Sequence, residues 1–315
     1  MQLKFVTLDV FTLKAYGGNP LAVVFLPETS ASASLTQRQK HIMCKEFNLS
    51  ETIFVHPVTE HNKRTIDIFT IECEIPFAGH PTIGAASWFL AHAAASNRGV
   101  DTLVTKSGEI PISIADQATQ AVAARIAHNT RIHQNRFPLA DLLRLHSSLK
   151  PFFLAGTDFP LFSIVNGMSQ TFIELPSLEA LAAVTTANGG EYLDVQHPSY
   201  LDEGWRSGLI CVYFFVRDVD DETLGKKVIR TRMMLGGFED PATGSSASGL
   251  TAWLALTEGK AGQEYQYQIV QGVEMGRRSD IGVVVALNHE RKIEKVELTG
   301  TAVQVSEGNI VVPEE

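Results

Sequence analysis

Two short motifs, one in each half of the sequence, constrain the fold most strongly. Each is a glycine-bearing turn that follows a predicted strand and leads into a helix rich in small residues. The first spans Pro76 to Ala86 and reads PFAGHPTIGAA, and the second spans Glu239 to Gly249 and reads EDPATGSSASG. Glycine lets a ligand approach the backbone, and a helix start presents N–H donors with a partial positive charge. The repetition indicates two similar half-chains, and two such helix starts facing each other would hold a small carboxylate.

The helices that follow these turns are expected to form the centres of the two halves. They are predicted from Pro81 to about Ala95 and from Ser245 to about Glu258, and both are apolar nearly all round. A helix that is apolar on all sides is a buried one. With 315 residues, 44% of them hydrophobic, the chain can build a sizeable core around each helix.

The rest of the pattern mixes strands and helices in both halves. Alternation predicts strands over 3–11, 65–71 and 122–126, and helical spacing predicts a helix over 36–47. Later elements are a helix from about Pro138 to Leu149, a helix capped by Ser177, and strands at 161–165, 171–174, 209–216, around 269, at 281–287, 293–299 and 310–312.

The best domain boundary is the polar stretch His133 to Arg136, just ahead of Pro138. This predicts an N-terminal lobe over 1–132 and a C-terminal lobe over 133–315, with the last strand allowed to return to the first lobe.

Charge and hydropathy argue against nucleic-acid and membrane partners. The net charge is −9, which repels a phosphate backbone, and the densest cationic stretch, 226–232, is interpreted as the solvated entry to a strand. The most apolar run, Gly208 to Val216, is far shorter than the ~20 residues of a transmembrane helix. The N-terminus shows no signal-peptide pattern, so we predict a soluble, cytoplasmic protein.

Known cofactor and nucleophile motifs are missing from the sequence. There is no Gly-x-Gly-x-x-Gly after a strand, no phosphate-binding P-loop, no His-Glu-x-x-His, no paired Cys-x-x-Cys and no Gly-x-Ser-x-Gly. We therefore expect no nucleotide cofactor and no metal. Cys44, Cys73 and Cys211 are too few and too odd in number for a disulfide framework and are interpreted as buried thiols.

Four segments together resemble a known family. They are Asp9 to Thr12 with Gly18 to Val24, then Leu49 to Val55, and the two turn motifs. Their order and spacing are similar to the PhzF-like family of phenazine-biosynthesis relatives, whose fold is that of diaminopimelate epimerase. Gln271-Gly272, Met275 to Arg277 and Thr299 to Val303 resemble the C-terminal pattern of that family.

The resemblance implies an α+β fold of two pseudo-symmetric lobes. Each lobe would be a curved mixed sheet around a central helix, with the active site in the cleft between the lobes. A homodimer is left open, and the partner expected is a small carboxylate-bearing substrate.

The resemblance also implies a set of site residues and a function. Glu51, His80 and Asp240 match catalytic positions, and the matching substrate-binding positions are Asn19, Ser50, Gly79, Gly244 and Ser245. The implied enzyme is a cofactor-independent isomerase in which Glu51 takes a proton from carbon and returns it to another position.

For each of these residues the sequence also allows a purely structural role. Glu51 lies in an apolar run in which Ile53, Phe54 and Val55 are expected to exclude water and raise its pKa. It could instead cap an edge strand or face solvent. His80 could be a packed core histidine, Asp240 a carboxylate that satisfies backbone N–H groups, and Ser245 a helix cap.

Two other functions stay open at this point. One is a non-catalytic protein that keeps the fold for ligand or partner binding. The other is a two-base epimerase of amino acids, which is disfavoured because neither glycine turn carries a thiol; Cys73, five residues before Ala78, is interpreted as a core residue of the preceding strand. The sequence departs from the family pattern at three places: the short stretch 232–239, Ser246 and Arg278. These departures are expected to change the shape of the pocket more than its chemistry.

Overall fold

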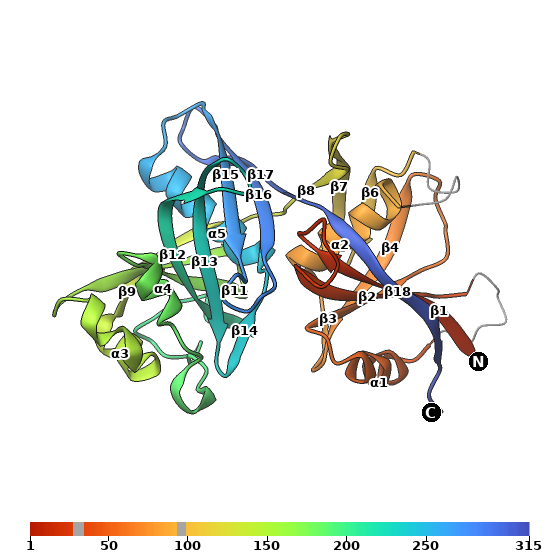
Figure 1. Cartoon of the computed structure of the whole chain (residues 1–315), viewed down its shortest axis with the longest axis horizontal. Helices are drawn as coiled ribbons and strands as arrows, with labels where there is room; N and C mark the ends of the chain where they lie inside the picture. Colours follow the sequence, from red (N-terminus) through yellow and green to blue (C-terminus); the bar gives the residue numbers. More distant parts are fainter. Residues whose placement is uncertain (28–34, 93–98, 315) are drawn as a thin grey trace. The chain divides into compact units, whose positions relative to one another are not determined.

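The computed structural model describes residues 1–27, 35–92 and 99–314 as a mixed α+β protein built mostly of strands (Figure 1). The chain forms two compact units: unit 1 is Met1–Ile126 with Leu298–Glu315, and unit 2 is Ala127–Glu297. The boundary falls after Ile126 rather than after Ile132. The polar stretch expected there is part of strand β9 (Arg131–Pro138), which pairs with β10 (Asp158–Val165) inside unit 2.

The sheet of unit 1 starts from β1 (Gln2–Val10). This strand pairs antiparallel with β2 (Asn19–Phe25) and with the C-terminal β18 (Ala302–Val311). β2 runs parallel to β3 (Glu51–Val55), which pairs antiparallel with β4 (Lys63–Thr70). The remaining strands of this unit are β5 (Glu74–Ile75), β6 (Thr102–Thr105), β7 (Gly108–Asp116) and β8 (Ala121–Arg125).

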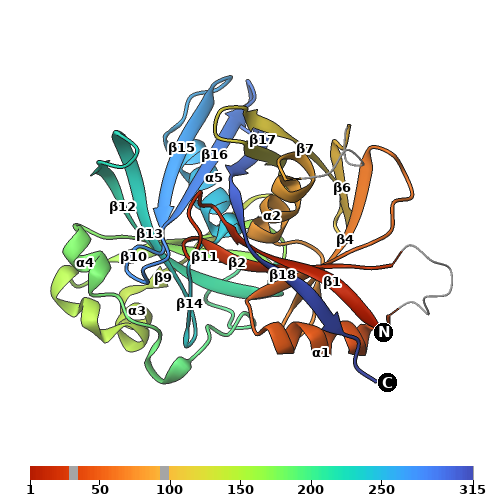
Figure 2. The same ribbon diagram turned by 45° about the vertical axis from the view of Figure 1, so that its right-hand side comes forward.

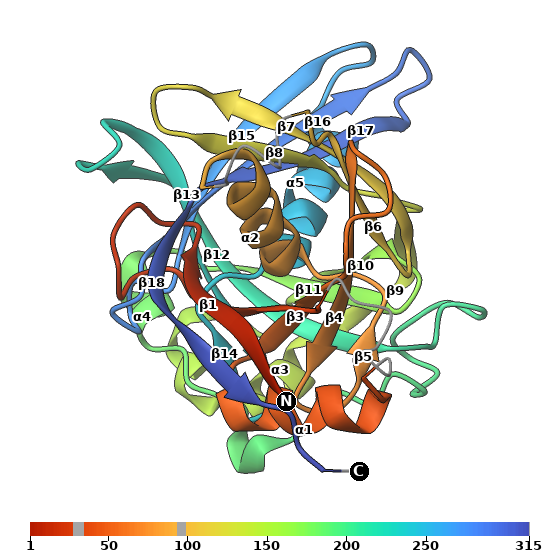
Figure 3. The ribbon, with the colours of Figure 1, turned by 90° about the vertical axis from the view of Figure 1, so that its right-hand side faces the viewer.

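Helix α2 (Gly79–Leu90) is the buried centre of unit 1 (Figure 3). It contacts β1, β2, β3, β7, β8 and β18. A Cβ placed on Gly84 would lie 2.4 Å from Leu21 Cδ2, so glycine lets the helix pack directly on β2. The predicted end of this helix near Ala95 lies outside the described residues. Helix α1 (Gln37–Phe47) begins at a capping box made by Thr36 and Gln39.

Helix α5 (Gly244–Glu258) is the corresponding helix of unit 2 (Figure 2). It contacts β10, β11 (Met168–Glu174), β15 (Glu264–Gln271) and β16 (Ser279–Leu287). The sheet also contains β12 (Leu209–Asp221), β13 (Lys226–Leu235) and β14 (Phe238–Asp240). Strand β17 (Ile293–Gly300) crosses the unit boundary at Leu298.

A second core of unit 2 lies under short helices. Helix α3 (Leu139–Leu145) is followed by a 3₁₀ helix, η2 (Ser147–Phe152), so the helix predicted over 138–149 is divided in two. Helix α4 (Leu178–Ala182) is capped by Ser177, as predicted, and η3 (Asn188–Gly190) follows it. The fully buried side chains of this core include Phe137, Leu142, Leu181 and Phe214.

Three details differ from the sequence-based expectations or bear on them. Cys44 and Cys211 are buried as expected, but Cys73 is exposed in the bend between β4 and β5. The cationic stretch 226–232 is not solvated throughout, because Arg232 is 7% exposed and forms a two-pronged ion pair with Glu239. Among the described residues, every helix is too short or too polar to span a membrane.

Candidate functional site

Glu51 is the first residue of β3, held between Leu21 of β2 and Thr70 of β4. Side chains alternate along a strand, and Phe54 of β3 belongs to a core with Met43 of α1. Glu51 therefore faces the opposite side, where α2 begins. Its side chain is 17% exposed, and its Oε2 is fully buried.

Burial raises the pKa of Glu51 from 4.5 to about 7, and a hydrogen bond from the Ser50 side chain opposes part of this rise. Of the three apolar residues expected to raise this pKa, only Ile53 and Val55 share the face of Glu51. Phe54 points to the other face of the strand and does not shield the carboxyl group. A carboxyl group with this pKa populates both protonation states near neutral pH, as acid–base catalysis requires.

His80 is the second residue of α2 and is 4% exposed. Its Nδ1 lies 3.5 Å from Glu51 Oε2 and 3.4 Å from Asn19 Nδ2. The Ser50 hydroxyl oxygen, which hydrogen-bonds to Glu51, also lies 3.4 Å from Asn19 Oδ1. The structure thus brings together Asn19, Ser50, Glu51 and His80, with Gly79 as the first residue of the same helix.

In unit 2, Asp240 ends β14 and is 8% exposed. Its Oδ2 accepts a hydrogen bond of 2.6 Å from Thr243 Oγ1. Gly244 and Ser245 are the first two residues of α5, and Ser245 is also 8% exposed. Thr243, at the N-cap position, makes no side-chain cap bond because its hydroxyl is directed to Asp240.

Only the first residues of each helix present N–H donors to a ligand. Pro81 has no N–H, and the N–H groups of Thr82 and Ala247 donate to the Ala78 and Thr243 carbonyls. The N–H groups whose acceptors lie outside the helix are therefore earlier ones, those of Gly79 and His80 in α2 and of 244–246 in α5.

The predicted residues fall into one group per unit. Five lie in unit 1 and three, Asp240, Gly244 and Ser245, lie in unit 2. That one ligand contacts both groups stays a prediction. Across the described ranges, no three His, Cys, Asp or Glu side chains are grouped as a metal site would need.

Sequence reasoning missed the residues that hold Asp240. Gln271 contacts both the Asp240 carbonyl and the Thr243 hydroxyl, and Tyr213 contacts Gln271. The one signal for them was the Gln271-Gly272 pair, which belongs to the C-terminal pattern but carried no assigned role.

A Ser–His–Asp cluster in unit 2 has the wrong geometry for nucleophilic catalysis. His133 Nδ1 accepts a hydrogen bond from the Asp202 backbone N–H, so its proton lies on Nε2, 2.9 Å from Ser163 Oγ. A triad histidine needs an unprotonated Nε2 to take the serine proton. Ser163 is also fully buried, and burial lowers the pKa of His133. The cluster therefore has a structural role: its hydrogen bonds connect β9, β10 and the loop that contains Asp202.

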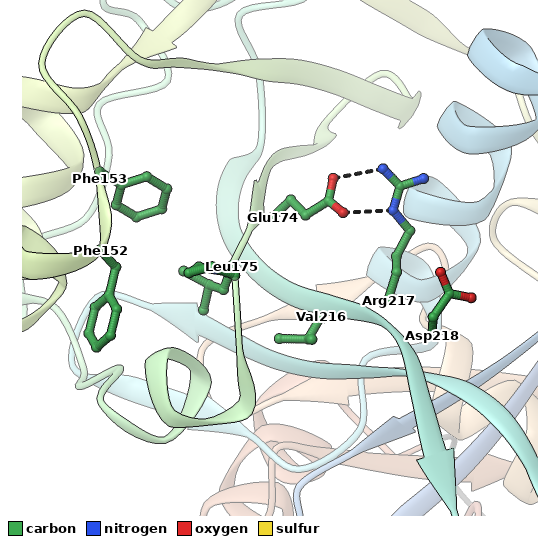
Figure 4. Close-up of a pocket in the computed structure, with 8 residues that line it drawn as sticks. Phe152, Phe153, Glu174, Leu175, Val216, Arg217 and Asp218 are labelled. Atoms are coloured by element: carbon green, nitrogen blue, oxygen red, sulfur yellow. Dashed lines mark hydrogen bonds and ion pairs between the residues drawn. The ribbon is translucent and has the colours of Figure 1, made fainter.

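A surface hollow of unit 2 is lined by Phe152, Phe153, Leu175 and Val216 on one side and Arg217 on the other (Figure 4). Arg217 makes a two-pronged ion pair with Glu174, at 2.7 and 2.8 Å. It also donates a single hydrogen bond to Glu258 at 2.8 Å. With two carboxylates already bound, this cation is a structural ion pair rather than a site for an anionic ligand.

Comparison with known proteins decides the family. The family model described as "Phenazine biosynthesis-like protein" matches residues 8–308. The chain belongs to this family. It is 30% identical, over 98% of its length and 99% of the relative's, to the trans-2,3-dihydro-3-hydroxyanthranilate isomerase of Pseudomonas chlororaphis. Other full-length relatives are also named isomerases, and the chain is an isomerase of the PhzF family.

Solved structures agree on the fold. A Bacillus anthracis phenazine biosynthesis protein of the PhzF family matches 99% of this chain and 100% of its own, with a TM-score of 0.73 at 20% identity. A probable proline racemase from Agrobacterium radiobacter matches 99% of this chain and 93% of its own, with a TM-score of 0.61 at 12% identity. The latter shares the fold alone. In this chain the buried thiol of Cys211 has its pKa raised to about 12 by burial, and neither glycine turn carries a cysteine.

Proposed function

We propose that this isomerase works without a cofactor and moves a proton between two carbons of a small carboxylate-bearing substrate, with Glu51 as the proton carrier. The observation that carries the proposal is the Glu51 carboxyl, whose pKa is raised to about 7 by burial and which lies 3.5 Å from His80. The family match supports the reaction class.

The reaction needs one group that both removes and returns a proton. The Glu51 carboxylate takes a proton from one carbon of the substrate, and the electron pair of that C–H bond moves into the adjacent unsaturated system. The same carboxyl then gives the proton to another carbon, so that a double bond shifts and nothing is consumed. A pKa near the working pH makes both half-steps accessible to one residue.

His80 and Asp240 are proposed to contact the polar groups of the substrate. The N–H groups at the starts of α2 and α5 are proposed to bind its carboxylate, because helix N-termini favour anions. Neither helix has an acidic residue in its first turn that would compete for this position.

The names of the relatives support a proposal for the substrate class. Isomerases of trans-2,3-dihydro-3-hydroxyanthranilate from two Pseudomonas species match this chain at 28% and 30% identity. We propose a substrate of the same kind, a partly reduced ring that carries a carboxylate, and trans-2,3-dihydro-3-hydroxyanthranilate is the first compound to test.

The test follows this compound in deuterated water with the wild type, Glu51→Gln and Glu46→Gln. Glu46 is an exposed glutamate of α1, so its variant controls for the change from carboxylate to amide. We expect the wild type and Glu46→Gln to isomerise the compound, and to place deuterium on carbon in those turnovers in which the Glu51 carboxyl exchanges its proton with solvent before it returns one to the substrate. Glu51→Gln should be slower by ~10²–10⁴-fold, the usual contribution of a general acid–base group.

Two results would count against the proposal, and they differ in meaning. Equal rates for Glu51→Gln and the wild type would remove Glu51 as the proton carrier. Tight binding of the compound by the wild type without isomerisation or deuterium uptake would remove this substrate.

A further inference from the structure

A buried chain of hydrogen bonds leads from β12 to the Asp240 carboxylate. The Tyr213 hydroxyl of β12 lies 3.0 Å from Gln271 Oε1 at the end of β15. Gln271 Nε2 donates to Thr243 Oγ1 at 3.0 Å, and Thr243 Oγ1 donates to Asp240 Oδ2 at 2.6 Å. Tyr213 and Gln271 are fully buried, and Thr243 is 8% exposed.

The directions of the bonds between Gln271, Thr243 and Asp240 are fixed by their neighbours, whereas the Tyr213 hydroxyl has a second acceptor, Thr231 Oγ1, also at 3.0 Å. Gln271 Nε2 also lies 2.8 Å from the Asp240 carbonyl, which can only accept. Gln271 Oε1 lies 3.3 Å from the Thr243 backbone N–H, which can only donate. The amide therefore has one orientation, the Thr243 oxygen receives the Nε2 hydrogen, and the Thr243 proton goes to the carboxylate.

The backbone of the turn that follows Asp240 contacts residues at the ends of two neighbouring strands. Ser279 Oγ lies 3.1 Å from the carbonyl oxygens of Pro241 and Arg277, either of which can accept its proton. Gly272 has φ +74°, and a Cβ there would lie 2.6 Å from the Pro241 carbonyl oxygen. The residues that follow Gln271 thus lie directly against the turn that carries Asp240, so the turn and its carboxylate are held by the paired ends of two strands, Gln271 of β15 and Ser279 of β16.

We propose that Thr243, Gln271 and Tyr213 are positioning residues that set the orientation of the Asp240 carboxylate for the substrate. The proposal rests on the proposed function, in which Asp240 contacts the substrate. Thr243 fixes the rotation of the carboxylate through a charge-assisted bond, Gln271 fixes the Thr243 hydroxyl, and Tyr213 fixes the Gln271 amide.

The kinetic test compares Thr243→Val, which removes the donor, with Thr243→Ser, which keeps it. Thr251→Val is the matched control, because Thr251 is a fully buried threonine of α5 whose hydroxyl bonds to the Ala247 carbonyl instead. With trans-2,3-dihydro-3-hydroxyanthranilate as the probe, Thr243→Val should lower kcat about 10- to 100-fold, the usual effect of a lost bond to a charged group, and change KM less. Thr243→Ser and Thr251→Val should stay within about threefold of the wild type, and Tyr213→Phe should fall between.

A second readout needs no substrate. In protein labelled with ¹³C at aspartate Cγ, the Asp240 signal is identified by its loss in Asp240→Asn. Thr243→Val should move the midpoint of its titration to higher pH, because the carboxylate loses its donor, and Thr243→Ser should not.

The two readouts separate the failure of the positioning from that of the function. An unmoved Asp240 titration in Thr243→Val would overturn the positioning role whatever the activity. So would a Thr243→Val enzyme with wild-type kcat while Asp240→Asn is impaired. Inactivity of the wild type on the probe, with the titration shifted as expected, would count against the proposed substrate and leave the positioning supported.

Discussion

The two turn–helix motifs look alike in sequence but hold their carboxylates in opposite ways. In unit 1, Glu51 comes from a neighbouring strand, and the contacts around it, between Glu51, His80 and Asn19, are 3.4–3.5 Å long. In unit 2, Asp240 comes from the chain just before the helix and accepts a bond of 2.6 Å from a hydroxyl that is itself fixed.

This difference fits two different tasks. A buried carboxyl group with only long contacts has little to stabilise its ionised form, and burial raises its pKa to about 7, where both protonation states are populated. A carboxylate held by a short charge-assisted bond keeps one position, which suits binding and orientation. Under the proposed function, the comparison assigns proton transfer to the carboxyl group with few close contacts, Glu51, and orientation to the carboxylate that is closely hydrogen-bonded, Asp240.

The largest effect should be a gain of stability in Glu51→Gln. The native state keeps a proton on Glu51 up to about pH 7, whereas the unfolded chain loses it near 4.5, so wild-type stability falls as the pH rises between these values. Glutamine does not ionise, so the stability of the variant does not fall in this pH range on account of position 51. At 1.36 kcal/mol per pKa unit it should be more stable by roughly 3 kcal/mol at pH 8 and little changed at pH 4. Urea unfolding at the two pH values measures this, and a destabilised variant at pH 8 would break the comparison.

Asp240→Asn should have the opposite sign. It replaces a carboxylate that accepts a short bond from Thr243 by a neutral amide, which weakens that bond. We expect a loss of about 1–2 kcal/mol in the free energy of unfolding at pH 8, in keeping with bonds to charged groups. The same urea experiment gives the value, and a variant as stable as Glu51→Gln would show that the two carboxylates are held alike.

The smallest effect concerns Ser50. Its side chain hydrogen-bonds to Glu51 and lowers the pKa of that carboxyl against the effect of burial. Ser50→Ala should therefore raise the pKa of Glu51 further, by less than about one unit. In the pH dependence of kcat/KM, the limb that reports an ionised base should move to higher pH. A limb that moves to lower pH would contradict the assignment of Glu51 as the base.

Much of this arrangement could be predicted from sequence because it is local. The glycine turns, the all-round apolar helices and the Ser177 cap depend on neighbouring residues, and α2, α5 and α4 begin within two residues of the predicted positions. The grouping of Glu51 with His80 came from the family resemblance.

The predictions that were wrong or missing concern features that depend on pairing between segments distant in the sequence. His133 to Arg136 is polar enough to suggest a linker, yet it is a strand because β10 lies beside it. Cys73 was expected in a core, but β4 ends at Thr70 and leaves it in an exposed bend. Tyr213 and Gln271 are far from Asp240 in sequence, and no local pattern marks a hydrogen bond formed through a sheet.

The most direct test of the account is the titration of Glu51 itself. In protein labelled with ¹³C at glutamate Cδ, the signal absent from Glu51→Gln identifies this residue, and its shift is followed from pH 3 to pH 10. The account predicts a midpoint near pH 7, well above the ordinary glutamate value of 4.5. A midpoint near 4.5 would contradict the claim that burial holds Glu51 ready to carry a proton.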